Sequence, residues 1–99
     1  MLDKNRRSIA GIRRQLLPIL KRHDVARAAL FGSFARGEAT KDSDLDILIE
    51  FRGQKSLLDL VGLKLELEDT TGRKVDVVTA RALHPAIRDQ VLAEQVTIL

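Results

Sequence analysis

The sequence predicts an α/β domain in which a small mixed β-sheet is flanked by helices. Two apolar segments of strand length, 44–51 and 74–79, are separated by an amphipathic segment of about a dozen residues. Such a strand, helix, strand unit places its two strands parallel and joins them with a right-handed crossover, so we expect these strands to be neighbours. The 99 residues, 44% hydrophobic and 31% charged, correspond to one folded domain, 1–99.

Residues 5–22 form the first predicted helix, followed by a buried strand at 27–31. Apolar side chains recur at helical spacing, with arginine and lysine between them: Ile9, Ile12, Leu16, Ile19 and Leu20. Pro18 lies inside this pattern. Because proline lacks an amide donor and clashes with the preceding turn, we expect a kink there or two short helices.

The next elements are a strand at 44–51, a helix after the turn that ends it, and a strand at 74–79. Ser56 is a suitable helix cap and Gly72 a suitable stop. The predicted core-facing stripe of this helix comprises Leu57, Leu60, Val61 and Leu65. A last helix over about 81–93, with Pro85 in its first turn, carries Leu83, Ile87, Val91 and Leu92, and 96–99 is a brief final strand.

Composition limits the chemistry that the chain can perform. With no cysteine there is no disulfide, thiolate nucleophile or cysteine-based zinc site, and His23 and His84 are too far apart in the sequence to give metal-ligand spacing. Any metal must therefore be bound by oxygen. No segment resembles a signal peptide or a membrane span, so we expect a cytoplasmic protein that does not contact a membrane.

The positive charge is concentrated at the start of the chain. The formal net charge is +3, and eight of the 17 lysines and arginines lie in the first 27 residues. Such a face is either a solvated helix surface, which we favour, or a contact for an anionic partner. Because the sequence has no tyrosine or tryptophan on which bases could stack, we expect no direct binding of nucleic acid.

Three aspartates indicate a metal-dependent reaction. Asp44 and Asp46 are separated by one residue in a strand, so both side chains leave the same face, with Cα atoms about 6.6 to 7 Å apart. Asp76 lies inside an otherwise apolar strand, where a lone carboxylate has no structural purpose. If the two strands are adjacent, the three carboxylates meet. Such groups hold two Mg²⁺ ions about 3.5 to 4 Å apart for phosphoryl or nucleotidyl transfer.

The segment before the acids predicts a phosphate site. Gly32 and Ser33 end a strand and precede residues that can begin a short helix, which directs free backbone amides toward an anion. Arg36 either contacts a phosphate or pairs with Glu38, Asp42 or the Asp44 region. Gly37 serves backbone geometry, and Ser43 mainly positions the turn through a side-chain hydrogen bond. Glu66, Glu68 and Asp69 are expected in solvent, His23 at the surface, and His84 as a helix cap or a partner contact.

The order Gly32-Ser33, Arg36-Gly37, Ser43-Asp44-Leu45-Asp46 and then a strand acid resembles the signature of the DNA polymerase beta-like nucleotidyltransferases, in particular the minimal nucleotidyltransferases (MNT proteins). The resemblance covers essentially the whole chain and implies the fold of that superfamily. It implies that Asp44 and Asp46 coordinate the metals, and that Asp76 completes the site and helps to deprotonate the attacking hydroxyl. Gly32 and Ser33 then fall on phosphate-binding positions, and Arg36 and Ser43 are the further candidates for nucleotide binding.

The same resemblance implies a partner. Minimal nucleotidyltransferases are typically encoded beside a helical HEPN protein, often an RNase toxin, and act as its antitoxin, in some cases by transferring AMP from ATP to a tyrosine. We therefore expect Mg²⁺-dependent transfer of a nucleoside monophosphate to a hydroxyl of a HEPN protein, because 99 residues leave no room for a separate acceptor-binding domain.

Two alternatives remain open at this point. The first is a non-catalytic, nucleotide-binding antitoxin that occludes its HEPN partner. The second, which the missing acceptor domain disfavours, is an antibiotic-modifying nucleotidyltransferase. Apolar stripes on the terminal helices also exceed what a few short strands cover, so we expect a homodimer or a heteromeric complex.

Overall fold

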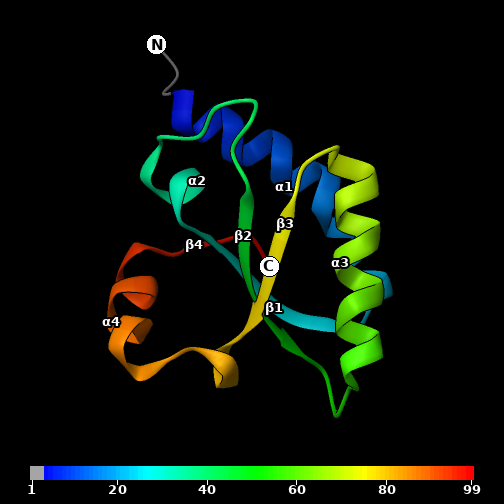
Figure 1. Ribbon diagram of the computed structural model, residues 1–99. Coiled ribbons are helices and arrows are strands. Elements are labelled where there is room, and N and C mark those ends of the chain that lie inside the picture. Colours follow the sequence, from blue (N-terminus) through cyan, green and yellow to red (C-terminus); the bar gives the residue numbers. More distant parts are fainter. Residues whose placement is uncertain (1–3) are drawn as a thin grey trace.

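The fold is a four-stranded sheet with helices packed on both of its faces (Figure 1). The computed structural model describes residues 4–99, with side chains from Ile9 onward. The elements in chain order are α1 (Lys4–Arg22), β1 (Val25–Phe31), α2 (Ser33–Arg36), β2 (Leu45–Phe51), α3 (Leu57–Thr71), β3 (Val75–Thr79), the 3-10 turn η1 (Ala80–Ala82), α4 (Pro85–Glu94) and β4 (Val96–Thr97). The predicted α/β class is confirmed.

The sheet is mixed, with the strand order β3-β2-β1-β4. Strand β1 pairs antiparallel with both β2 and β4, whereas β2 and β3 are parallel neighbours joined through α3, as the crossover pattern predicts. Ser56 caps α3 in a reciprocal capping box with Asp59, and Gly72 ends it in the left-handed conformation. These two signals set the length of the helix that joins β2 to β3.

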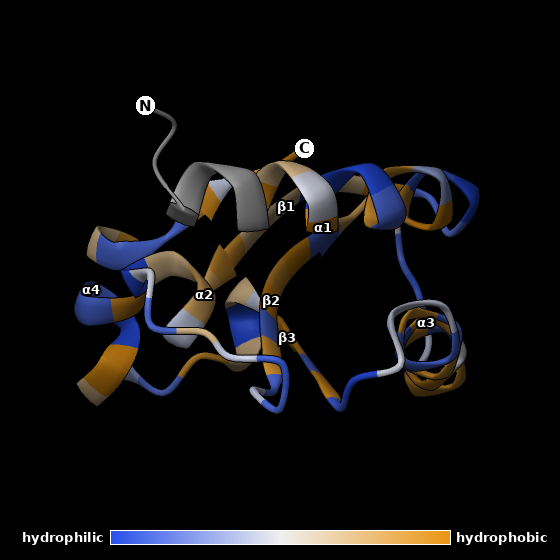
Figure 2. Cartoon of the chain, turned by 90° about the horizontal axis from the view of Figure 1, so that it is seen from above, coloured by the Kyte–Doolittle hydropathy of each residue, from blue (hydrophilic) through white to orange (hydrophobic). Residues whose placement is uncertain are grey.

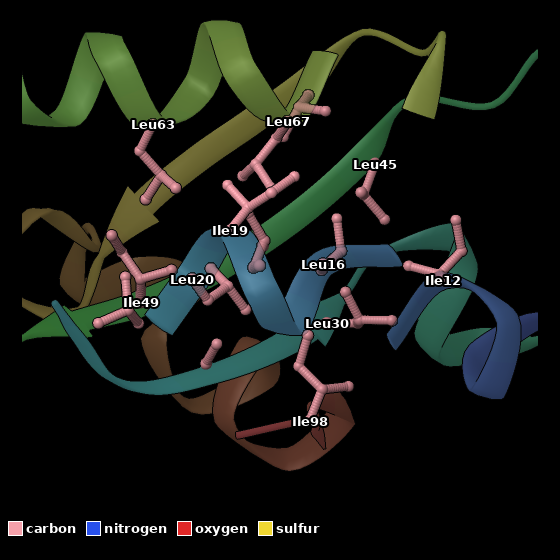
Figure 3. Packing of buried hydrophobic residues seen from close by; sticks show 14 of the residues in the cluster. Ile12, Leu16, Ile19, Leu20, Leu30, Leu45, Ile49, Leu63, Leu67 and Ile98 are labelled. Atoms are coloured by element: carbon pink, nitrogen blue, oxygen red, sulfur yellow. The ribbon is translucent and has the colours of Figure 1, made fainter. Parts of the chain in front are cut away.

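The main core lies between the sheet and the pair α1 and α3. Successive side chains of a strand point to opposite faces, so Leu45, Ile47 and Ile49 of β2 all enter this core, where each is at most 1% exposed. Figure 3 shows Leu16, Ile19 and Leu20 of α1 packed against Leu63 and Leu67 of α3 and against the strands. This layer makes β2 a rigid support for whatever its other face carries.

The opposite face of the sheet is only partly covered. A small cluster of Leu48, Leu83 and Val91, with Phe31 and Val78 beside it, joins α4 to the strands. Seen from above, α4 and α3 lie at opposite sides of the strands, whose hydrophobic residues run between them (Figure 2). Within residues 4–99, no helix is long and apolar enough to cross a bilayer.

Helix α1 continues through Pro18, so the prediction of two short helices is wrong. Pro18 is exposed, whereas its neighbours Ile19 and Leu20 and the preceding Leu16 are buried. The carbonyl that Pro18 leaves without an amide donor is that of Arg14, which is also exposed, so this carbonyl lies on the solvent side of the helix. Burial of the apolar side keeps the two halves together.

The predicted core stripe of α3 is also wrong in part. Leu63 and Leu67 are fully buried and Leu60 is half-buried, while Leu57, Val61 and Leu65 are 73%, 40% and 59% exposed. The helix is apolar on two sides, so periodicity could not decide which side faces the sheet. The last helix also differs from the expected one over about 81–93, because α4 begins only at Pro85, after η1. Of its expected apolar stripe, Leu83 and Val91 are buried, whereas Ile87 and Leu92 are exposed.

Truncation of α3 leucines tests this orientation. We expect Leu63→Ala to lower the free energy of unfolding by about 2 to 5 kcal/mol, because it removes a fully buried side chain and leaves a cavity. Leu65→Ala, the same change on the exposed side, should cost no more than about 0.5 kcal/mol. Urea unfolding at low protein concentration measures both. A larger loss in Leu65→Ala than in Leu63→Ala would mean that α3 faces the sheet with its other side.

Candidate active site

The paired strands bring two of the predicted acids side by side on the open face of the sheet. In the parallel β2–β3 ladder the register partner of Asp46 is Asp76, and on the antiparallel side its partner is Phe31. Register partners share a face, so both carboxylates leave the side opposite the main core, next to the Leu48 cluster. Asp44 precedes β2 by one residue and is exposed. The predicted gathering of these acids depends on the β2–β3 pairing, which is confirmed.

The acids carry more negative charge than their surroundings neutralise. Burial raises the pKa of the Asp46 carboxyl above its ordinary value, and the charges of Asp76 and Asp44 raise it further. The guanidinium of Arg36 acts in the opposite direction but does not cancel these effects. Asp46 therefore occupies a position where a cation would be favourable.

Gly32 lies directly against Asp46. Its backbone has φ 70° and ψ −146°, a region that is essentially restricted to glycine. A Cβ added there would overlap Oδ2 of Asp46. The glycine thus permits close approach of the β1–α2 turn to the carboxylate. It also directs the chain into α2, which begins at Ser33, so the predicted turn and short helix are confirmed.

Arg36 pairs with acids rather than standing free. Its Nε donates to Oε1 of Glu38, and its Nη1 lies 3.4 Å from Oε2 of Glu94 at the end of α4. Of the two interpretations of Arg36, the pairing with Glu38 is therefore the one seen, with Glu94 as an additional partner. The Glu94 contact joins residues 58 positions apart, and no local signal in the sequence indicates it.

The loop between α2 and β2 leads to Asp44 and is held by polar contacts. The hydroxyl of Ser43 accepts a hydrogen bond of 2.7 Å from the amide of Thr40, which is the turn-positioning role expected of Ser43. Nη1 of Arg73 donates to the carbonyls of Thr40 and Ser43, at 2.8 and 3.0 Å. No motif in the sequence marks Arg73. A usable signal is its place just before β3, since the residues that precede two paired parallel strands lie side by side.

Charged residues away from this face have other partners. Glu66, expected in solvent, pairs with Arg22 and lies 2.9 Å from Nε2 of His23, and so ties α3 to the end of α1. The carboxylate of Glu68 accepts from the amide of Val75. Nδ1 of His84 accepts from the amide of Ala86, which confirms its role as a helix cap. These contacts stabilise the fold and are not part of the candidate site.

The donor set fits a hard cation, although the side chains do not form a closed metal cage. Among the residues described, no three acidic or histidine side chains are grouped tightly enough to surround one ion. Asp46 and Asp76 nevertheless supply oxygen ligands from adjacent strands, and the excess negative charge around Asp46 calls for neutralisation. Mg²⁺ typically takes one or two protein carboxylates and completes its shell with phosphate and water. Asp44, Asp46 and Asp76 as metal ligands stay a prediction.

The strained glycine turn, the short helix after it and the adjacent strand acids define a class of phosphate-transferring site. This chain belongs to the nucleotidyltransferase domain family, whose model matches residues 13–97, and it is a nucleotidyltransferase. The predicted resemblance to the minimal nucleotidyltransferases is thereby confirmed. A minimal nucleotidyltransferase of known structure is 44% identical, with a TM-score of 0.77 over 91% of this chain and 92% of that one.

Relatives in archaea carry a more specific name. A Methanocaldococcus jannaschii protein named among the protein adenylyltransferases is 51% identical over 93% of this chain and 99% of its own length. Protein adenylyltransferase MntA of Thermococcus cleftensis is 41% identical over 79% of each chain. A toxin–antitoxin structure with AMP-PNP has a TM-score of 0.77 at 20% identity, covering 88% of this chain and 72% of that one, and so shares the fold.

Proposed function

We propose that the chain transfers AMP from ATP to a hydroxyl group of a HEPN-family protein, in a Mg²⁺-dependent reaction that makes it the antitoxin of that partner. The observation that carries this proposal is the pairing of Asp46 with Asp76 against the Gly32 turn on the open face of the sheet. The protein adenylyltransferases named above support the choice of AMP and of a protein acceptor.

The turn at Gly32 and Ser33 would hold the triphosphate. Gly32 has no side chain to keep a ligand from the backbone, and Ser33 adds a hydroxyl at the start of α2. Arg36 at the end of α2 is held at this edge by Glu38 and Glu94, and it would contact a phosphate by exchanging one of these carboxylates for it. Ser43 would act on the nucleotide through the loop that it shapes rather than by chemistry of its own.

The acids would serve the transfer itself. In the reaction the acceptor oxygen bonds to the α-phosphorus, the bond from that phosphorus to the β-phosphate oxygen breaks, and pyrophosphate leaves with its electrons. Mg²⁺, when bound, supplies neutralisation of the phosphate charge and a lower pKa for the acceptor hydroxyl. Asp44, Asp46 and Asp76 would hold it, and Asp76, exposed at the sheet edge, would take the hydroxyl proton.

The acceptor would approach over the part of this face that α4 leaves open. The cluster of Leu48, Leu83 and Val91 covers one end of the face, whereas Asp44 and Asp76 are exposed. A tyrosine or other hydroxyl on a partner's surface is therefore a more suitable acceptor than a small molecule that needs an enclosed pocket. Assembly with the HEPN protein as a hetero-oligomer would bring that hydroxyl to the acids.

Label transfer tests this function. The chain is incubated with Mg²⁺, ATP labelled at the α-phosphorus, and a HEPN protein from the same genome, sought first beside the gene for this chain. We expect label on the HEPN protein with the wild type and none with Asp44→Ala, Asp46→Ala. ATP labelled at the γ-phosphorus should label nothing, which separates nucleotidyl transfer from phosphoryl transfer.

The same variant separates catalysis from occlusion. If the HEPN protein binds but receives no label, and the double variant still silences it, then the chain neutralises its partner by covering it and the proposed reaction is wrong. Silencing lost together with label transfer, while the complex still forms, would support the chemistry.

A further inference from the structure

Arg73 contacts two segments of the candidate site, α2 and the loop before Asp44. It belongs neither to the sequence motif nor to the three aspartates. Its guanidinium donates to the carbonyls of Thr40 and Ser43 and lies over the ring of Phe34, 5.0 Å from the ring centroid. Phe34 follows Ser33 in α2 and is 3% exposed. One side chain just before β3 therefore contacts both the loop that leads to Asp44 and the segment Gly32–Phe34 at the junction of β1 and α2, the phosphate turn.

The contact with Ser43 determines the direction of the chain at the catalytic acid. The carbonyl of Ser43 belongs to the planar peptide group that joins Ser43 to Asp44, so a hydrogen bond to that oxygen fixes the plane from which Asp44 departs. One residue later, the amide of Leu45 donates to the carbonyl of Lys74, 2.9 Å away. Asp44 is thus held between two contacts, both made by residues that precede β3.

Among the described residues, few other contacts hold this loop. Glu38, Thr40, Lys41 and Asp42 are exposed, Ser43 is half-buried, and Ala39 is half-buried against the main core. An open pocket of about 390 Å³ lies beside the loop, lined by Thr40, Lys41, Phe34 and Arg73 among others. Packing on this side is therefore sparse. Glu38 is tied to α2, by its side chain to Arg36 and by its amide to the carbonyl of Ser33, whereas the described hydrogen bonds among residues 40–43 join only these residues. Within the described part of the chain, the bonds from Arg73 attach residues 40–43 to the segment that precedes β3.

We propose that Arg73 is a positioning residue for the nucleotidyl transfer: it aligns Asp44 with Asp46 by clamping the Thr40–Ser43 loop onto Phe34 of the phosphate turn. The planar guanidinium suits this role, because it can bridge two carbonyls while its face lies on an aromatic ring. Both bonds come from Nη1, so a lysine keeps the charge and a donor but offers no planar face to lie on the ring. The kinetic part of this proposal rests on the proposed function, whereas the clamp itself does not.

Amide hydrogen exchange without nucleotide or partner tests the clamp. We expect the amides of residues 40–45 to exchange about tenfold faster or more in Arg73→Gln, with an intermediate effect in Arg73→Lys, while the core of β2 stays protected. Lys74→Gln is the matched control, since it removes a neighbouring exposed cation that has no side-chain partner among the described contacts. Unchanged exchange in Arg73→Gln would overturn the proposal, whether or not the wild type transfers AMP.

Steady-state transfer tests the role in catalysis. We expect Arg73→Gln to lower kcat about 10- to 100-fold with little change in the KM for ATP, because a misplacement of about 1 Å at a reacting group costs rate rather than binding. Arg73→Lys should recover part of this loss and Lys74→Gln should behave as the wild type. An equal loss of kcat in Lys74→Gln would assign the effect to positive charge and overturn the positioning role. A wild type that transfers nothing contradicts the proposed function instead.

Discussion

Asp46→Asn should abolish AMP transfer and at the same time make the folded protein more stable at neutral pH. The amide keeps the shape of the side chain but cannot hold a cation as a carboxylate does, so we expect the rate of label transfer to fall about a thousandfold or more. Stability changes the other way because the variant no longer places a charge, at a half-buried position, beside Asp76 and Asp44.

The pH dependence of stability identifies the electrostatic cause. The pKa of Asp46 is raised in the folded protein, so the folded state holds this proton more tightly than the unfolded chain does. The stabilising effect of that proton is complete below the usual aspartate pKa of about 3.9 and is lost as the pH rises through the raised pKa. The advantage of Asp46→Asn over the wild type should therefore be absent at about pH 3 and grow toward neutrality.

The matched control is Asp69→Asn, which removes an exposed carboxylate of α3 on the other side of the molecule. It should leave both label transfer and the pH profile of unfolding unchanged. If Asp46→Asn transferred AMP at the wild-type rate, Asp46 would not be one of the catalytic residues. A loss of stability at neutral pH in Asp46→Asn, measured by urea unfolding without Mg²⁺, would mean that the surroundings of Asp46 favour its charge, contrary to its raised pKa.

Local signals in the sequence were sufficient to predict the order of the helices and strands and the parallel pairing of β2 with β3. Ser56 and Gly72 marked the ends of α3, and the crossover rule made β2 and β3 parallel neighbours. Asp46 and Asp76 could then be predicted to lie on one face, since strand geometry leaves little freedom once two strands are paired. The register that sets the two residues directly opposite each other follows from packing of the main core.

The orientation of α3 and the course of α1 were not predictable in this way. Helix α3 has leucines around most of its circumference, so its sequence pattern fits either side against the sheet. At Pro18 the cost of a missing hydrogen bond had to be weighed against burial of Leu16, Ile19 and Leu20, and packing prevailed. In both cases tertiary contacts decided between local alternatives of similar energy.

The contacts that complete the candidate site come from residues far apart in the sequence. Arg36 meets Glu94 only because α4 packs on the open face of the sheet, and Arg73 reaches Ser43 only because β3 pairs with β2. Neither arginine carries a motif that names its partner. The motif thus predicts which residues perform the chemistry, whereas the contacts around them emerged only from the fold.

Gly32→Ala should reduce label transfer about a hundredfold or more and destabilise the fold as well. The added methyl group would meet the Asp46 carboxylate, and the backbone at φ 70° and ψ −146° is closed to a residue with a Cβ, so the β1–α2 turn must move away from Asp46. A displacement of about 1 Å between phosphates and acids is enough for such a loss of rate. Gly53→Ala, at φ 69° with open space around the new Cβ and beyond the end of β2 that is remote from Asp46, is the control. It should cost about 1 to 2 kcal/mol of stability and leave the rate unchanged. If both alanine variants transfer AMP at the wild-type rate, the close approach of Gly32 to Asp46 is not required for the reaction, and the phosphate turn must lie elsewhere.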